Sequence, residues 1–425
     1  MTEQGGRGAS EPRAPADGIS VQGTALVGIG LVISQLIAML QMLVVSRMLG
    51  PEQFGVFGAM AVILLLGSTC LGATQVVVSR HVASGGSERH IGAWLVLVVG
   101  LVAFAITAVL APLISAVLDL SDVVGVILVG ATFVPFAVTG AQLGLLQGAE
   151  RHTRLGALYV VSTGARVAGA ILGAAIGGTA DAALLGLTLG ATVGAIAGQF
   201  MLVGQPSWDA HGEEGPRRFL TDVAHAAHAL IALYALTNID VLIARAQLPA
   251  YDAGLYAAGA LVNRAVFFLP TAILVAAFPR MVAGARNAQR QAVFAVAGLG
   301  LLASAIVALL PNLVIGIMAG EQFLAVAPEA WIFALAGAGF GVVQVLLYAR
   351  MAHHDRRAAV LLWGGVIALL VLGITLGTSI HALALCAAFV AWVVAIAGVI
   401  WARTSPPPLG SEVVGDDEPV PTPWD

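Results

Sequence analysis

Long apolar runs, separated by short polar stretches, recur along the whole chain. Each run is long enough to cross about 30 Å of hydrocarbon as an α-helix. The pattern therefore predicts an all-α polytopic membrane protein. About twelve spans are expected, at roughly 20–47, 54–79, 91–118, 123–148, 155–177, 182–203, 220–246, 254–282, 291–318, 325–350, 358–377 and 381–402.

The composition supports this prediction. Hydrophobic residues make up 59% of the 425 residues, charged residues only 10%, and the mean hydropathy is +0.96. A soluble domain carries about 25% charged residues, so this chain lacks the polar groups needed to cover a water-exposed surface. The Gly-, Pro- and acid-rich ends at 1–18 and 404–425 have little to bury and are expected to be disordered tails.

The positive charges are divided unequally between the two sides of the predicted bundle. There is no Lys, and of the 19 Arg residues only Arg47 and Arg245 fall on one side, while Arg166 and Arg264 fall within spans. The others lie in the tails and in the loops of the opposite side, which the positive-inside rule places in the cytoplasm. Both termini are therefore expected to be cytoplasmic.

Two passages of the sequence follow the same plan about 200 residues apart. "SRMLGPEQFGVFGAM" (46–60) and "ARAQLPAYDAGLYAAGA" (244–260) each end an apolar run on an Arg and continue through a Leu, a Pro, a short polar turn, a Gly and an aromatic residue into a second run. Later helix ends recur at a similar spacing. The pattern predicts two six-helix repeats, 19–203 and 220–403, joined by a cytoplasmic linker at 204–219. Chance similarity of helix ends in so biased a composition is the alternative.

These passages resemble the polysaccharide flippases of the multidrug/oligosaccharidyl-lipid/polysaccharide (MOP) exporter superfamily. The first is similar to the family's start, and "NIDVLIARAQLPAYDAGLYAAGALVNRAVFFLP" and "GEQFLAVAPEAWIFALAG" are similar to its later helices. The resemblance implies a MATE-like two-lobe fold in a bacterial inner membrane, and transfer of undecaprenyl-diphosphate-linked oligosaccharide for surface polysaccharide synthesis. It also implies a polysaccharide polymerase complex as a partner, beside the lipid-linked substrate and the bilayer.

Ionisable residues inside the spans suggest the chemistry of a substrate site, because burying them at lipid depth is costly. Arg166 lies midway along its span, and no Asp or Glu lies within any span of the first half. In the second half, Asp240 and Arg264 lie at comparable depths and are expected to pair across two helices. An unpaired Arg favours an anion, since a guanidinium matches phosphate oxygens in a bidentate way.

Each candidate also has a structural interpretation. Arg166 can extend along its helix to an interface or bind backbone carbonyls. Arg47 and Arg245 either cap helix C-termini or contact substrate. Polar side chains on the spans either line a sugar-binding surface or hold helices together. The predicted substrate-binding residues are Arg166, Arg47, Arg245, Arg264, Asp240, Asn238, Gln35 and Gln41.

Other functions fit the sequence less well. A lipid II-type flippase would add further helices and more cavity arginines, and a MATE-like multidrug/cation antiporter would need an acidic residue within the first lobe; both remain alternatives. An enzyme acting on a lipid-linked glycan would need a long outward loop, which the sequence does not provide. No cofactor, metal or nucleic-acid partner is expected, because there is no Lys for a nucleotide-binding loop, no metal-ligand cluster and no basic stripe.

Overall fold

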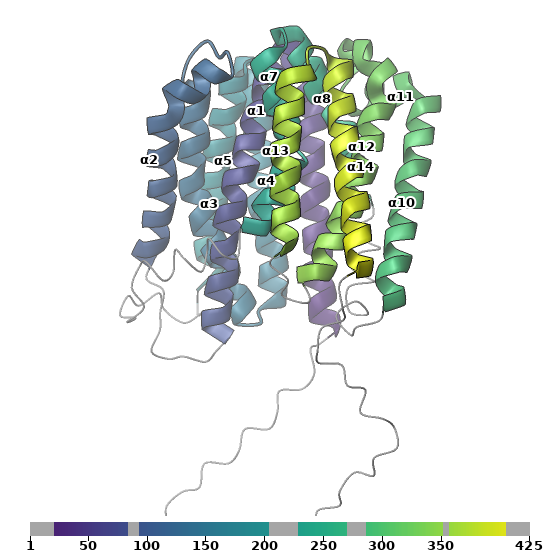
Figure 1. The fold of residues 1–425 in the computed structure, drawn as a ribbon. Coiled ribbons are helices and arrows are strands. Elements are labelled where there is room, and N and C mark those ends of the chain that lie inside the picture. Colours follow the sequence, from purple (N-terminus) through teal and green to yellow (C-terminus); the bar gives the residue numbers. More distant parts are fainter. Residues whose placement is uncertain (1–20, 84–92, 204–227, 270–285, 352–356, 405–425) are drawn as a thin grey trace, which may run out of the picture.

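The computed structural model describes residues 21–83, 93–203, 228–269, 286–351 and 357–404 (Figure 1). The described residues form helices and no strand. Helices satisfy every backbone polar group internally, which lipid demands. The predicted tails at 1–18 and 404–425, except for Thr404, and the predicted linker at 204–219 lie outside the described residues.

The first half consists of five helical elements. The longest, α1, continues for 63 residues, about three times the length needed to cross a bilayer. It is bent back at Gly50, where a φ of 71° favours glycine, so that α1 contains two antiparallel segments. The elements are α1 (Val21–Ala83), α2 (Ala93–Val117), α3 (Val124–Gly148), α4 (His152–Gly177) and α5 (Ala180–Met201).

The second half is more interrupted. Its first span consists of the segment His228–Leu236 and α7, which meet at an angle of 48°. Pro311 starts a short helix directly after α10, because proline cannot continue the preceding helix. The remaining elements are α7 (Ile239–Gln247), α8 (Ala250–Phe268), α10 (Arg286–Leu309), α11 (Pro311–Met318), the 3₁₀ helix η1 (Glu321–Glu329), α12 (Ala330–Met351), α13 (Arg357–Leu376) and α14 (Ile380–Thr404).

The described helices include nine that are long and apolar enough to cross a membrane, or ten if the bent pair around α7 is one span. The two segments of α1 count as one helix in these totals. The multi-pass membrane fold is thus confirmed, whereas the count of twelve stays a prediction. Large apolar side chains face outward along the bundle, as the 87% exposed Ile176 and the 79% exposed Leu309 illustrate, and lipid would cover them.

Figure 1 shows that α1 begins and α14 ends at the same end of the bundle, which we term the inner end. The bend at Gly50, α11 and the connection from α2 to α3 lie at the opposite, outer end. We term 21–203 the N-lobe and 228–404 the C-lobe. Within the N-lobe, α4 and α5 pack so closely that a methyl group on either Gly169 or Gly186 would collide with the carbonyl group of the other.

Candidate functional site

Arg47 connects the N-lobe to the end of a C-lobe helix. Its Nη1 donates to the carbonyl of Leu43 one turn earlier (2.8 Å), and its Nη2 donates to the carbonyls of Gly316 (3.3 Å) and Ile317 (2.5 Å) at the C-terminus of α11. The last carbonyls of a helix lack intrahelical partners and carry the negative end of its dipole. Arg47 therefore caps a helix, as one interpretation predicted, but that helix belongs to the opposite lobe.

Arg245 makes the reciprocal connection. It lies in the last turn of α7 in the C-lobe, and its Nη2 donates at 2.6 Å to the carbonyl of Asp119, in the connection between α2 and α3 of the N-lobe. Arg245 is only 7% exposed, and its Nε has no hydrogen-bond partner. Asp119 has a φ of 48°, uncommon for a residue other than Gly, which turns the chain at this point. Arg47 and Arg245 thus each bind backbone carbonyls at the outer end of the other lobe.

Further contacts at the outer end strengthen this connection. Ser46 donates to the carbonyl of Ala319 at 2.9 Å, and the Gln322 side-chain amide donates to the carbonyl of Ser46 at 2.7 Å. All three donors, Arg245, Ser46 and Gln322, thus bind backbone carbonyls of the opposite lobe.

The two bends at the outer end also pack backbone against backbone. A Cβ atom on Gly55 would lie 2.9 Å from the nitrogen of Gly254, and one on Gly254 would overlap the carbonyl of Pro51. Phe54 and Phe323 meet edge to face at 5.6 Å. The hydrogen bonds, the ring contact and the close glycine approaches that join the two lobes in the described ranges all lie at the outer end. The outer end is therefore closed.

Arg166 lies in the middle of α4 and is half-buried. Its guanidinium carbon lies 5.2 Å from the centre of the Phe136 ring on α3, a cation–π contact. In the part of the chain that the structure describes, Arg166 has no hydrogen-bond or ion-pair partner. It therefore binds no backbone carbonyl there, contrary to one structural interpretation. Its five N–H donors are free for a ligand.

Gln41 lies at a similar depth to Arg166, on the face of α1 that packs against α4. Gln35 lies on a different face of the same helix. Gly30 on α1 packs against Gly156 on α4, and these segments run in the same direction from the inner end. Gln41, eleven residues beyond Gly30 on the same helical face, is 5% exposed. Gln35 points away from this face and is exposed.

The structure does not contain the expected direct ion pair between Asp240 and Arg264: the two groups interact electrostatically, but each forms its hydrogen bond with another residue. Asp240, 1% exposed, accepts a hydrogen bond at 2.8 Å from the hydroxyl of Tyr256, and its second carboxylate oxygen is buried without a partner. Arg264 donates through Nε to the side-chain oxygen of Asn238 at 3.0 Å instead.

The physical reason is the break in the first C-lobe span. Asn238 lies at this break, where its amide nitrogen donates to the carbonyl of Tyr234 (3.0 Å) and to the hydroxyl of Thr237 (2.8 Å). Its oxygen then faces Arg264. The terminal nitrogens of Arg264 have no hydrogen-bond partner among the described residues, so each lobe contributes one half-buried Arg with unused donors.

Three functional candidates were missed by the sequence analysis: Gln75 on α1, Gln147 on α3 and Tyr159 on α4. The Gln75 amide nitrogen donates at 2.7 Å both to the Gln147 side-chain oxygen and to the Tyr159 hydroxyl. They come from three helices, and no local spacing connects them. We term these three residues the glutamine–tyrosine cluster.

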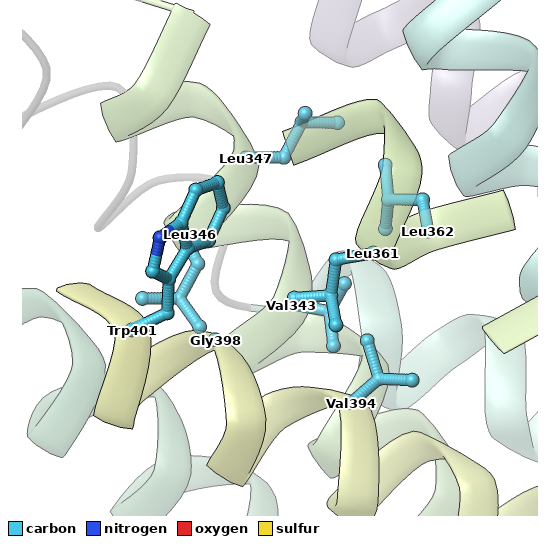
Figure 2. A pocket seen from close by; sticks show the side chains of 8 residues that line it. All are labelled: Val343, Leu346, Leu347, Leu361, Leu362, Val394, Gly398 and Trp401. Atoms are coloured by element: carbon cyan, nitrogen blue, oxygen red, sulfur yellow. The ribbon is translucent and has the colours of Figure 1, made fainter. Parts of the chain in front are cut away.

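A small hollow in the C-lobe is apolar (Figure 2). It lies between α12, α13 and α14 and measures about 20 Å³, enough for no more than one water molecule. Its lining includes Leu346, Leu362 and Trp401, and no charged side chain. It has neither the size nor the chemistry of an anion site. No group of three metal-ligating side chains occurs among the residues that were placed.

The family model of polysaccharide biosynthesis proteins matches residues 20–284. No curated protein matches the sequence significantly. An inward-facing multidrug resistance transporter of the MATE family, in the MOP superfamily, has a TM-score of 0.66 at 14% identity, over 90% of this chain and 97% of its own.

Two further structures share the fold. The lipid II flippase MurJ in an inward closed conformation has a TM-score of 0.65 at 11% identity, over 90% of this chain and 88% of its own. An outward-facing MATE transporter has a lower TM-score of 0.58 at 14% identity, over 90% and 94%. These likenesses establish a MATE/MurJ-like fold.

Proposed function

We propose that this chain, which belongs to the family of polysaccharide biosynthesis proteins, is a flippase for undecaprenyl-diphosphate-linked oligosaccharide. Its family and its MATE/MurJ-like fold support a role as a membrane transporter of the MOP superfamily. The proposal adds the substrate, the bacterial cytoplasmic membrane as its location and the cytoplasm as the side of the inner end. It involves no chemical step on the substrate.

The free guanidinium of Arg166 is the observation that carries this proposal. A diphosphate that leaves water loses its hydration, and only fixed positive groups or hydrogen-bond donors can replace that stabilisation. Arg166 provides such a group at membrane depth, because it makes no hydrogen bond within the described structure and contacts only the Phe136 ring electrostatically. Arg264 adds a second guanidinium group, whose orientation is set by its hydrogen bond to Asn238.

The arrangement also favours an anionic substrate over a cationic one. A cation antiporter would expose carboxylates to its substrate, but Asp240 is buried and accepts from Tyr256. Among the described residues, Arg166 and Arg264 are instead half-buried within their helices and have unused hydrogen-bond donors. The closed outer end leaves the inner end as the side from which a lipid diphosphate enters.

A complementation experiment tests this function. Deleting the gene is expected to abolish surface glycan and to accumulate lipid-linked glycan in the cytoplasmic leaflet. Arg166→Ala is expected to behave like the deletion at normal protein level, and Arg166→Lys to restore export partly, because Lys keeps the charge but loses the bidentate geometry.

Arg154 on the same helix supplies a matched control, since it donates to the carbonyls of Met201 and Val203 near the inner end. Arg154→Gln is expected to export normally. Wild-type export by Arg166→Ala would remove the support for a diphosphate substrate.

A further inference from the structure

The glutamine–tyrosine cluster lies toward the inner end of the N-lobe. Gln147 is the penultimate residue of α3, and Tyr159 lies in the third turn of α4, near its inner end. Gln147 is exposed, while Gln75 and Tyr159 are half-buried. An exposed amide that faced lipid would lose its hydrogen bonds at a cost of several kcal/mol, so a water-filled opening suits these side chains better.

Tyr159 and Gln147 lie on the same faces of α4 and α3 as Arg166 and Phe136, which form the cation–π contact. Tyr159 precedes Arg166 by seven residues on α4, and Gln147 follows Phe136 by eleven on α3; both spacings return to the same face. Seven residues correspond to about 10 Å along the helix. The cationic site and the cluster thus follow one another along the facing sides of α3 and α4, with the cluster nearer the inner end.

The hydrogen bonds within the cluster leave both donors and acceptors unused. The two N–H groups of Gln75 are occupied by Gln147 and Tyr159. This leaves the Gln75 oxygen as an acceptor, and the Gln147 amide nitrogen and the Tyr159 hydroxyl hydrogen as donors, with no partner in the part of the chain that is described. A set of neutral donors and acceptors beside an aromatic ring suits a polyhydroxylated ligand rather than an ion.

We infer that Gln75, Gln147 and Tyr159 bind the hydroxyl groups of the sugar attached to the diphosphate, while Arg166 binds the diphosphate itself. This inference rests on the flippase function proposed above and assigns the sugar subsite of that site. The phosphate reaches deeper into the membrane than the sugar, which stays nearer the inner opening. The cluster thereby favours a glycosylated lipid over the bare lipid diphosphate.

Binding of two defined lipids to the purified full-length protein tests the inference. The probes are undecaprenyl diphosphate and undecaprenyl diphosphate carrying a single hexose. The wild type is expected to bind the hexose-bearing lipid more tightly. Gln147→Leu and Tyr159→Phe are each expected to weaken binding of that lipid about five- to tenfold, the usual contribution of one hydrogen bond, and to leave binding of the bare lipid unchanged.

Two reference variants separate the sugar subsite from the function. Arg166→Ala is expected to weaken the binding of both lipids. Thr132→Val removes a different polar contact inside the N-lobe, the 2.7 Å hydrogen bond to Thr188, and is expected to change neither affinity.

The outcomes are distinguishable. Equal wild-type affinity for the two lipids, or an unchanged sugar preference in both Gln147→Leu and Tyr159→Phe, would overturn the subsite and leave the flippase function standing. Tyr159→Phe removes a single oxygen atom, so it tests the subsite even if Gln147→Leu fails to fold. Failure of the wild type to bind either lipid would overturn the function itself.

Discussion

Arg47 and Arg245 occupy equivalent positions in the two similar sequence passages, 46–60 and 244–260, and each donates hydrogen bonds to backbone carbonyls of the opposite lobe. Arg47 reaches the C-terminus of α11, and Arg245 reaches Asp119 between α2 and α3. The two lobes are therefore held together at the outer end by a reciprocal pair of arginine contacts. A transporter that alternates between inward and outward states must break both contacts to open outward.

Neutralising these arginines is expected to populate the outward-open state. Arg47→Gln and Arg245→Gln should each shift the ratio of outward to inward molecules about ten- to a hundredfold toward outward, because a charge-assisted hydrogen bond contributes about 1.5–3 kcal/mol. The double variant should shift it further. Distances between spin labels on Ser121→Cys and Glu321→Cys, in the outer connections of the two lobes, measure this ratio.

Gln247 provides the control for this measurement. Its side chain donates at 3.0 Å to the carbonyl of Ile374, a side-chain-to-carbonyl bond at the outer end that lies within the C-lobe. Gln247→Leu is expected to leave the label distances as in the wild type. Label distances that stay short in both arginine variants would show that other contacts hold the outer end closed.

Gly254 is expected to be indispensable for outer closure. An added methyl group would overlap the carbonyl of Pro51 in the opposite lobe, and backbone cannot move aside as a flexible side chain can. Gly254→Ala should therefore raise outward accessibility and reduce glycan export, at near-normal protein level. Gly298→Ala, where no neighbouring atom lies within 4 Å, serves as the matched control and should be neutral. A Gly254→Ala protein with wild-type label distances would be incompatible with the close approach.

Tyr256 is expected to stabilise Asp240 in the folded C-lobe. The Tyr256 hydroxyl donates to Asp240, whose other oxygen is already buried without a partner. Tyr256→Phe should lower the free energy of unfolding in detergent by about 1–3 kcal/mol, because a buried carboxyl group then loses its side-chain donor.

A double-mutant cycle separates this contact from the ion pair that the sequence suggested. Asp240→Asn combined with Tyr256→Phe should recover more stability than Asp240→Asn combined with Arg264→Gln. The opposite order would indicate that the charge of Arg264, rather than the tyrosine hydroxyl, stabilises Asp240.

The sequence predicted the helical membrane fold because apolar run length is a local property that lipid enforces. It also predicted that Arg47 and Arg245 are related, since a duplication preserves spacing. It did not predict their partners. Those partners are backbone carbonyls of Gly316, Ile317 and Asp119, and every residue has a carbonyl, so no sequence pattern distinguishes the ones that accept.

The two errors at the site have a similar cause. The expected pairing of Asp240 with Arg264 relied only on their similar depth in the membrane. The orientation of α7 after the break at Asn238 determines which neighbour each side chain contacts. The Tyr256 hydroxyl, rather than Arg264, donates the hydrogen bond to the Asp240 carboxylate. The glutamine–tyrosine cluster combines three helices whose relative rotation is set by tertiary packing.

The most direct measurement of the central claim is flipping by the purified protein in liposomes. Liposomes that contain undecaprenyl diphosphate carrying a hexose are treated with a glycosidase from outside, which reports the lipid exposed on the outer leaflet. We expect complete cleavage with the wild type or Arg154→Gln, and cleavage of only about half of the lipid, as in protein-free liposomes, with Arg166→Ala. Complete cleavage with Arg166→Ala at equal protein content would contradict the role of Arg166 as the diphosphate-binding group.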